Sequence, residues 1–433
     1  MKPRPPYWSD RSAGIKSTAG SMNIAFFVNV FPAPSETFIL NQVTGLLDRG
    51  HRVDIYANAR ATPSKPDSKV SEYGLMERTT YFDVPASLPI RPLRAIPLLL
   101  SSKRKCRLRS AVQSLNFLRY GRVSLSLRLF YSALQLPRQV RYDVIHAQFG
   151  SLGPTALCLR DIGAISGKLV TSFRGYDIAT LTGRRGGSYR KLFREGDLFL
   201  PVSRHFAQML LDHGCDESKI MVHHSGIDCG AFSFRLRTRL NGEPTKLVTI
   251  GRLVEKKGIG YAVRAVARLI GTGRRVRYTV VGDGEMRTEL EKLVSGLRLA
   301  PHVRLVGWRN QEEIIRFLED AHLLVAPSVT AANGDLEGIP NSLKEAMARG
   351  LPVVSTVHAG IPELVQDGRS GFLVPERDVD ALADRLAFLI DHPDRWAQMG
   401  RFGRQQVRDH FDTDTLNDRL VEAYHQLARS SHL

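Results

Sequence analysis

The order of apolar and polar stretches along the chain constrains its fold more than any other feature. Apolar runs of strand length alternate with amphipathic stretches of helix length, and this alternation occurs twice, over residues 23–223 and again from residue 247. Strands that alternate with helices predict a parallel sheet covered by helices. The interruption at residues 231–245 has weak periodicity, a glycine and a proline. We therefore expect two α/β domains joined by a short linker.

Two doubly wound halves imply a cleft between the domains, and ligands of such sheets bind beyond the carboxyl ends of the strands. The length of 433 residues is enough for two separate cores. The polar, basic start of the chain predicts a disordered tail, or a gene start placed too early, before Met22. The expected boundaries are 1–21 for the tail, 22–235 and 236–405 for the two domains, and 406–433 for a C-terminal helix.

Within the first half, residues 60–82 are expected to be irregular, residues 90–140 helical, and residues 219–223 a short strand. The other strands expected in the chain are 23–30, 52–56, 144–147, 168–173, 198–202, 247–250, 277–281, 303–306, 323–326 and 352–355.

The charge of the chain is unevenly distributed. The formal net charge is +18, and the first 240 residues hold 35 Lys and Arg against 17 Asp and Glu, whereas residues 241–433 hold 26 of each. No acidic residue lies between Asp83 and Asp143, a stretch with twelve basic residues. Such a block attracts polyanions, of which the candidates are nucleic acid, an anionic membrane and a phosphorylated substrate.

Leu98, Leu99 and Leu100 beside the basic cluster favour the membrane, because a leaflet surface accommodates both charge and apolar side chains. Nucleic-acid-binding proteins usually interleave aromatic residues or carry a recognisable module, and neither is present, so we expect no nucleic-acid partner. A solvated basic surface without a partner is the alternative. The residues expected at the membrane are Arg91, Arg94, Lys103, Arg104, Lys105, Arg107 and Arg109.

Membrane-spanning segments and metal ligands are not expected. No apolar run approaches the ~18 residues that cross a bilayer. The four cysteines show neither a C-x-x-C pair nor metal-ligand spacing, which indicates reduced thiols in a cytoplasmic protein. We expect a cytoplasmic protein that binds peripherally to the inner face of the cytoplasmic membrane.

Loops that follow strands of the second half carry charged or small residues. In Gly251-Arg252-Leu-Val-Glu-Lys-Lys257-Gly258, Arg252 and Lys257 bracket a turn that opens a helix. Two cations at a helix N-terminus form an anion site that suits a diphosphate, although basic loop residues are also commonly solvated. Gly282 and Gly284 in Val-Gly-Asp-Gly permit close approach of the backbone to a ligand, but any tight turn has similar residues.

The loop Glu337-Gly-Ile-Pro-Asn-Ser-Leu-Lys-Glu345 has the most specific pattern. Asn341 is the expected N-cap of the following helix, and Gly338 leaves free backbone amides before it. Glu337 can reach a sugar hydroxyl. Glu345, about one turn into the helix, can accept hydrogen bonds from a ribose diol, although alone it would equally suit a solvated helix surface. Glu, Gly, Pro, Asn and Glu at these offsets together indicate a ligand site.

The pattern E-G-x-P-N-x3-E, preceded by G-R-L…K-G and by V-G-D-G, resembles that of the retaining glycosyltransferases of family 4. The resemblance covers nearly the whole chain from Met22. It implies the GT-B architecture, in which two Rossmann-like domains face one another across a cleft and the C-terminal helix crosses back to the first domain. It also implies that the first domain binds the acceptor and the second a nucleotide sugar, here a UDP- or GDP-sugar, with no metal or other cofactor.

The resemblance implies roles for individual residues. Arg252 and Lys257 would hold the donor diphosphate, Glu337 would contact the transferred sugar, and Glu345 would contact the ribose. Backbone around Trp308 and Arg309 would contact the base. The remaining residues of the expected donor site are Gly251, Gly282, Gly284, Gly338, Ile339, Pro340 and Asn341.

In the first half, Phe31-Pro-Ala-Pro-Ser35-Glu36-Thr-Phe-Ile39 resembles the loop of colanic-acid-type exopolysaccharide glycosyltransferases. Ser35 and Glu36 either cap a helix or face the acceptor. His146, at a strand end, either packs there or polarises a hydroxyl group.

Family members usually have F-H-G-x-D where this chain has Phe173-Arg174-Gly-Tyr-Asp177. Arg174 cannot act as a base, because arginine stays protonated. It would instead bind a phosphate, either of a lipid-linked acceptor or of the leaving group. Asp177 is expected to form hydrogen bonds within the cleft.

Together these features predict a retaining hexosyltransferase. It would transfer a hexose from a nucleotide sugar to a polyprenyl-diphosphate-linked saccharide, in the biosynthesis of a bacterial exopolysaccharide or other cell-surface polysaccharide. Cations near the leaving diphosphate would stabilise its growing charge without Mg²⁺. The alternatives are a GT-B sugar-nucleotide epimerase or phosphorylase, and a catalytically silent donor-binding scaffold, which Arg174 suggests.

Overall fold

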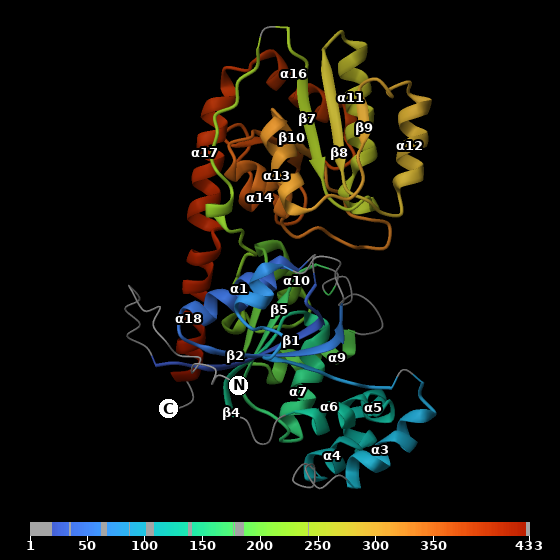
Figure 1. The fold of residues 1–433 in the computed structure, drawn as a ribbon, viewed down its shortest axis with the longest axis vertical. Coiled ribbons are helices and arrows are strands. Elements are labelled where there is room, and N and C mark those ends of the chain that lie inside the picture. The colour runs from blue at the N-terminus through green and yellow to red at the C-terminus, as the bar shows by residue number, and fades with distance from the viewer. Residues whose placement is uncertain are drawn as a thin grey trace, which may run out of the picture.

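The structure, a computed structural model, describes residues 20–33, 36–61, 67–85, 87–100, 108–136, 141–175, 177, 186–240 and 242–429. They form two α/β domains, one above the other in Figure 1, and each domain is built on a six-stranded sheet. In both sheets the neighbouring strands are parallel. The prediction of two doubly wound halves is confirmed.

The N-terminal sheet has the strand order β3-β2-β1-β4-β5-β6. Between its central strands β1 and β4 lies the switch point at which doubly wound sheets bind ligands. Phe27 of β1 belongs to one hydrophobic core and Phe26 to another, on the opposite face of the sheet. Both faces of β1 are therefore buried, which explains its nearly continuous apolar sequence. The strands are β1 (Asn23–Phe31), β2 (Arg52–Arg60), β3 (Thr79–Tyr81), β4 (Arg141–Ala147), β5 (Ser166–Phe173) and β6 (Leu198–Pro201).

The C-terminal sheet repeats this arrangement with the order β12-β11-β10-β7-β8-β9, and its switch point lies between β7 and β10. Two further hydrophobic cores involve its strands. The strands are β7 (Thr245–Ile250), β8 (Val276–Val281), β9 (Val303–Leu305), β10 (Leu323–Ala326), β11 (Val353–Thr356) and β12 (Gly371–Val374).

The helices surround the two sheets (Figure 1). Those of the first domain are α1 (Thr37–Asp48), α2 (Ser68–Glu72), α3 (Ile90–Leu100), α4 (Leu108–Ser114), α5 (Phe117–Leu125), α6 (Arg128–Gln135), α7 (Gly153–Asp161), α9 (Gly186–Glu195) and α10 (Arg204–Asp212). Those that follow are α11 (Ile259–Gly271), α12 (Arg287–Gly296), α13 (Gln311–Asp320), α14 (Asn341–Ala348), α15 (Ile361–Leu364), α16 (Val379–Asp391), α17 (Arg395–His410) and α18 (Thr413–Arg429).

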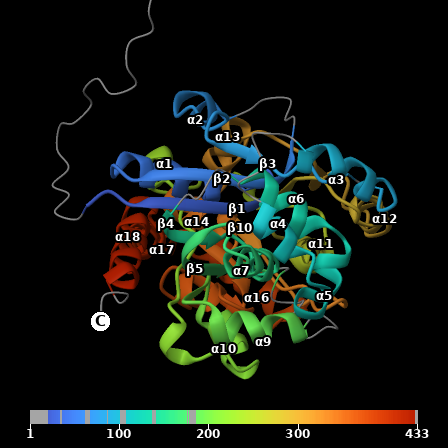
Figure 2. The same cartoon turned by 90° about the horizontal axis from the view of Figure 1, so that it is seen from below.

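The last helix, α18, returns to the first domain, as expected. Arg49 at the end of α1 pairs with Asp418 of α18 at 2.7 Å, and Asn417 donates a hydrogen bond to the main-chain oxygen of Asn41. The expected boundary at residue 406 falls inside α17, and the chain leaves the second domain only after that helix ends at His410. Figure 2 shows α18 on the side of the N-terminal domain opposite α3–α6.

Some elements differ from the sequence prediction. The strand expected at 219–223 is wrong, because only Ile220 forms an isolated bridge with Phe199. Two short strands, β3 and β12, were not expected. Each has at most four residues at a sheet edge, too few to show a clear periodicity.

The expected helical stretch 90–140 forms helices α3–α6, which lie between β3 and β4. The membrane role expected for Arg91 is wrong, because its side chain is buried and donates to the main-chain oxygens of Pro85 and Ser126. Arg94 and Arg109 are exposed. Lys103, Arg104, Lys105 and Arg107 lie outside the described residues, as do the side chains of residues 98–100. In the part of the chain that the structure describes, no helix has the length and apolar character needed to cross a bilayer.

Candidate active site

Two loops at the carboxyl edge of the C-terminal sheet bring a lysine and a glutamate together. The loop after β7 contains the short 3-10 turn Glu255–Lys257, and the long loop after β10 contains Glu337. Both loops lie at the switch point of the sheet. Lys257 Nζ is 2.6 Å from Glu337 Oε2, and both side chains are mostly buried. The fold thus joins two residues that the sequence analysis placed at one site.

Glu337 is held in its ionised form. Burial by itself raises the pKa of this carboxyl group, but the charges of Lys257 and Lys256 outweigh burial and hold the pKa below its usual value. Lys256 is itself buried and holds the segment before Glu337, since its Nζ pairs with Asp335 at 3.0 Å and donates to Leu336 O at 3.2 Å. The burial of Lys256 is not evident from the sequence, because a pair of adjacent lysines does not reveal which one is buried.

The glycines near this pair serve the packing of loops against one another. Gly282 has φ of +144°, and a Cβ atom there would lie 1.8 Å from Gly251 O. A Cβ atom at Gly284 would lie 2.5 Å from Leu253 O. The close approach that these glycines permit is therefore to the neighbouring loop. Their contact with a donor ligand stays a prediction.

Helix α14 begins beside the ion pair, but not as expected. The prediction of Asn341 as the N-cap is wrong: Pro340 occupies that position in an extended conformation, and Asn341 is the first helical residue. No side chain caps the helix. Its first amides are therefore not occupied by a capping side chain and suit an anion.

Lys344 in α14 is completely buried and was not singled out from the sequence. Its Nζ donates to the main-chain oxygen of Ser225 at 2.6 Å. Ser225 belongs to the connecting segment, the stretch between α10 and β7 that joins the two domains. Burial lowers the pKa of Lys344 to about 7, although the Glu345 carboxylate opposes the shift. Burial also raises the pKa of Glu345, although the Lys344 charge opposes that shift. Leu343, Lys344 and Met347 are all buried, so helical periodicity is the signal that could have revealed this lysine.

The other residues expected at the donor site lie around the same edge. Arg252 is exposed in the loop after β7. Trp308 is 66% exposed, and Arg309 donates to the main-chain oxygen of Trp308. The neighbouring residue Gly307 accepts a hydrogen bond from the main-chain amide of Gly282, which places this segment beside the Val-Gly-Asp-Gly turn. Loops of both sheets meet here, since a Cβ atom at Gly338 would lie 3.4 Å from Arg174 O.

In the N-terminal domain, the Arg174 guanidinium forms hydrogen bonds within the domain and with the connecting segment. It donates to Gln148 O and Oε1 at 3.1 and 2.8 Å, to Gln42 Oε1 at 3.2 Å and to Ser225 Oγ at 2.9 Å, and it lies over the Phe38 ring. Burial lowers the pKa of Arg174 to about 10, so it remains charged at neutral pH. Ser225 accepts from Arg174 through its side chain and from Lys344 through its main chain, and it therefore links the two halves of the site.

Glu36 is the N-cap residue of α1, without a side-chain capping hydrogen bond. Burial raises the pKa of Glu36 to about 7, although the positive charge of Arg174 opposes the shift. Glu36 therefore lies close enough to Arg174 for an electrostatic interaction. Ser35 lies outside the described residues.

The acceptor-side role expected for His146 is wrong. Its side chain is fully buried, with Nδ1 2.6 Å from the Tyr424 hydroxyl of α18 and Nε2 2.8 Å from Ser172 Oγ. Burial, reinforced by the charge of Arg174, holds the pKa of His146 well below its usual value. A neutral ring engaged at both nitrogens holds α18 against β4 and is not presented to an acceptor.

Asp177 forms hydrogen bonds, as expected, but they stabilise its own loop. Its carboxylate accepts from the main-chain amides of Gly150, Arg174 and Gly175 at 2.7 to 3.0 Å. It is 2% exposed. We conclude that Asp177 shapes the turn that carries Arg174 and does not itself face the junction between the domains.

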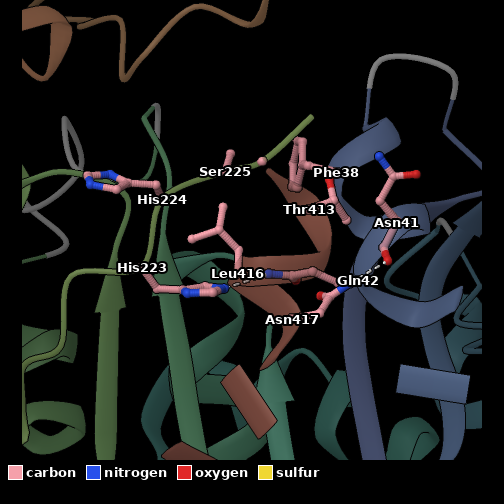
Figure 3. Close-up of a pocket in the computed structure, with 10 residues that line it drawn as sticks. Phe38, Asn41, Gln42, His223, His224, Ser225, Thr413, Leu416 and Asn417 are labelled. Atoms are coloured by element: carbon pink, nitrogen blue, oxygen red, sulfur yellow. Dashed lines mark hydrogen bonds between the residues drawn. The ribbon is translucent and has the colours of Figure 1, made fainter. Parts of the chain in front are cut away.

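A small cavity lies where α1, the connecting segment and the start of α18 meet (Figure 3). In Figure 3 the side chains of Gln42 and His223 point toward one another, and their nitrogens are 3.3 Å apart. Burial, with the charge of Arg174, lowers the pKa of His223 to about 3, so its ring is neutral. The cavity measures about 10 Å³, which is room for about one water molecule and far too small for a sugar.

Comparison with known proteins identifies the family. A family model described as "Glycosyltransferase Family 4" matches residues 35–230, and one described as "Glycosyl transferases group 1" matches residues 233–406. WcaL of Salmonella typhimurium, whose name assigns it to colanic acid biosynthesis as a glycosyltransferase, is 38% identical over 92% of this chain and 98% of its own length. The chain belongs to glycosyltransferase family 4.

A further relative and two solved structures are also similar to this chain. The amylovoran biosynthesis glycosyltransferase AmsK of Erwinia amylovora is 35% identical over 94% of this chain and all of its own length. The structure of HepE from Anabaena in complex with UDP aligns with a TM-score of 0.67 at 18% identity, over 94% of this chain and 100% of HepE. The lipopolysaccharide outer core galactosyltransferase WaaB aligns with a TM-score of 0.63 at 14% identity, over 95% of this chain and 100% of WaaB. These structures confirm the GT-B fold.

Proposed function

We propose that this family 4 glycosyltransferase transfers a hexose from a UDP- or GDP-sugar to a lipid-linked saccharide, with retention of anomeric configuration, during biosynthesis of a bacterial exopolysaccharide. The pair of Lys257 and Glu337 at the switch point of the C-terminal sheet carries the proposal. The names of WcaL and AmsK, which refer to colanic acid and amylovoran, support the polymer class. The HepE complexes named with UDP and with UDP-glucose support a nucleotide-sugar donor.

Lys257, Arg252 and the first turn of α14 would bind the donor diphosphate. When the glycosidic bond to the diphosphate breaks, negative charge grows on the leaving group, and fixed cations and backbone amides stabilise that charge. Glu337, the partner of Lys257 in the ion pair, would contact the transferred sugar. We propose a route in which the acceptor attacks from the face that the diphosphate leaves and the leaving phosphate takes the acceptor proton, which retains the configuration.

Metal independence is part of this proposal. Two Asp-x-Asp sequences occur, at 378–380 and 412–414, and the first carboxylate of each has a structural role. Asp378 caps α16 by accepting from the main-chain amide of Ala381. Asp412 accepts from the main-chain amides of Cys229 and Asp414, at the point where the chain returns to the first domain.

Binding of nucleotides tests the donor site directly. In a thermal-shift panel of UDP, GDP, ADP and their common sugars without metal, one nucleotide at ~100 times its dissociation constant is expected to stabilise the protein by about 2.7 kcal/mol. Lys257→Ala should abolish the shift, whereas Lys292→Ala, which removes an exposed lysine of α12, should leave it unchanged. The absence of a shift with every nucleotide would contradict the proposed donor site.

We further propose that α3–α6 bind the inner face of the cytoplasmic membrane, where a polyprenyl-diphosphate-linked acceptor resides. These helices expose several large apolar side chains, which are uncommon together on a surface that contacts only water, and the exposed Arg94 and Arg109 belong to the same helices. Leu118 is 88% exposed and Leu93 is 70% exposed. Among the side chains that the structure describes in α3–α6 and their connections, the other large exposed apolar residues are Ile90, Ile96, Val112, Leu115, Phe117 and Leu125.

Vesicle flotation checks this surface. The protein is expected to float with vesicles that contain anionic lipid, and less so as salt is raised, because salt screens the contribution of the basic residues. Leu93→Asp combined with Leu118→Asp should weaken flotation at least about tenfold. Leu240→Asp changes an equally exposed leucine (77%) in the segment before β7, and should have no effect. Binding that ignores lipid charge would contradict the proposal.

A further inference from the structure

His358 lies directly behind Glu337 and has no part in the donor site as proposed above. It belongs to the loop after β11 and is 1% exposed, so no substrate reaches it. Its Nε2 atom lies 3.0 Å from the main-chain nitrogen of Glu337. Because a main-chain amide can only donate, Nε2 must accept through its lone pair and therefore carries no proton.

The other ring nitrogen of His358 faces a carboxylate. Its Nδ1 atom lies 2.5 Å from Glu376 Oε1, in the loop after β12. Burial by itself raises the pKa of Glu376, but the hydrogen bonds from Thr330 and His358 outweigh burial and hold the pKa below its usual value. An ionised Glu376 accepts, so the proton of a neutral His358 ring resides on Nδ1. A carboxylate that fixes a histidine tautomer in this way also fixes the orientation of the ring.

Glu376 and His358 hold the Glu337 loop at two places. Thr330, seven residues before Glu337 in the same loop, donates its main-chain amide to Glu376 Oε2 at 2.8 Å and its hydroxyl to Oε1 at 3.2 Å. Lys256 binds the same loop between these two places, at Asp335 and Leu336. The path of the chain into Glu337 is thus determined by buried polar contacts from three neighbouring loops.

We propose that His358, kept in its Nδ1–H tautomer by Glu376, is a positioning residue of the glycosyl transfer reaction. Its Nε2 atom accepts a hydrogen bond from the main-chain amide of Glu337 and so directs the Glu337 side chain toward Lys257 and the transferred sugar. The inference rests on the proposed role of Glu337. In this proposal the buried pair of His358 and Glu376 acts through Glu337 and contacts neither substrate.

Two substitutions of similar size separate the two contacts of the ring. In His358→Gln the side-chain amide can place an oxygen where Nε2 stood and accept from Glu337. In His358→Asn the shorter amide can reach Glu376 only. We expect His358→Gln to keep kcat within about threefold of wild type, and His358→Asn to lower kcat by about 10²-fold with the donor KM nearly unchanged, because a small displacement of a reacting group costs this much. The thermal shift with nucleotide confirms that both variants are folded.

The two variants overturn the proposal if they behave alike. Equal activity near that of wild type would mean that the bond to Glu337 is not needed, and an equal loss would mean that the ring itself matters and not the acceptor at Nε2. Nitrogen NMR of the ¹⁵N-histidine-labelled wild-type protein provides a test that needs no acceptor substrate. The signal that disappears in His358→Gln should show a protonated Nδ1 and an unprotonated Nε2, and the opposite tautomer overturns the proposal. If the tautomer is as stated but no sugar is transferred, the proposed function fails and the tautomer assignment does not.

Discussion

Replacement of Glu337 with Gln is expected to lower sugar transfer by about 10³-fold, which corresponds to about 4 kcal/mol of transition-state stabilisation. The carboxylate is ionised and held 2.6 Å from Lys257, where a neutral amide of the same shape removes the charge and keeps the volume. Nucleotide binding should persist or strengthen, because the substitution frees Lys257 to interact with the diphosphate. The measurements are transfer rates and a nucleotide titration on the same preparation.

A matched control separates this effect from a general loss of negative charge. Glu289 is an exposed carboxylate in the first turn of α12, and Glu289→Gln should keep full activity. If Glu337→Gln loses nucleotide binding together with activity, the carboxylate acts by holding the donor loop together, and its proposed contact with the sugar is contradicted.

Lys344→Met is expected to change the pH dependence of stability. Burial lowers the pKa of Lys344 to about 7, whereas the same side chain in the unfolded chain titrates near 10.4. Between these values the unfolded chain binds more protons than the folded protein, so this lysine makes stability rise with pH across the window. Below about pH 7 the cost of its buried charge is present in full, and above about pH 10.4 it is absent.

Methionine removes this contribution. The free energy of unfolding of Lys344→Met minus that of wild type should therefore be about 4 kcal/mol larger at pH 6 than at pH 10. Urea unfolding of both proteins at several pH values measures the difference. Lys292→Met, at an exposed position, should show a difference that does not vary with pH. A pH-independent difference for Lys344→Met would mean that burial does not shift the titration of this lysine.

Local sequence patterns predicted the fold well where an element is long or buried on both faces. The alternation of apolar strands and amphipathic helices predicted both sheets, since central strands such as β1 and β10 are buried on both faces and so show a nearly continuous apolar run. Edge strands such as β3 and β12 are short and escaped prediction. The burial of Arg91 was missed for a different reason. A basic cluster in a sequence suggests solvent-exposed side chains, and only the tertiary contacts show that Arg91 is buried and donates to main-chain oxygens.

The candidate site divides along the same line. The sequence alone determined which loops gather charged and small residues at the carboxyl edge of the C-terminal sheet, because residues directly after strands must meet at one edge of a parallel sheet. Only the tertiary structure decided which side chains face that edge. In the folded chain Lys257, and not Lys256, pairs with Glu337. Lys344 is buried against the connecting segment, and His146 forms a hydrogen bond with α18. Those outcomes depend on contacts between segments far apart in the chain, and periodicity within one segment carries no information about the partner that it will meet.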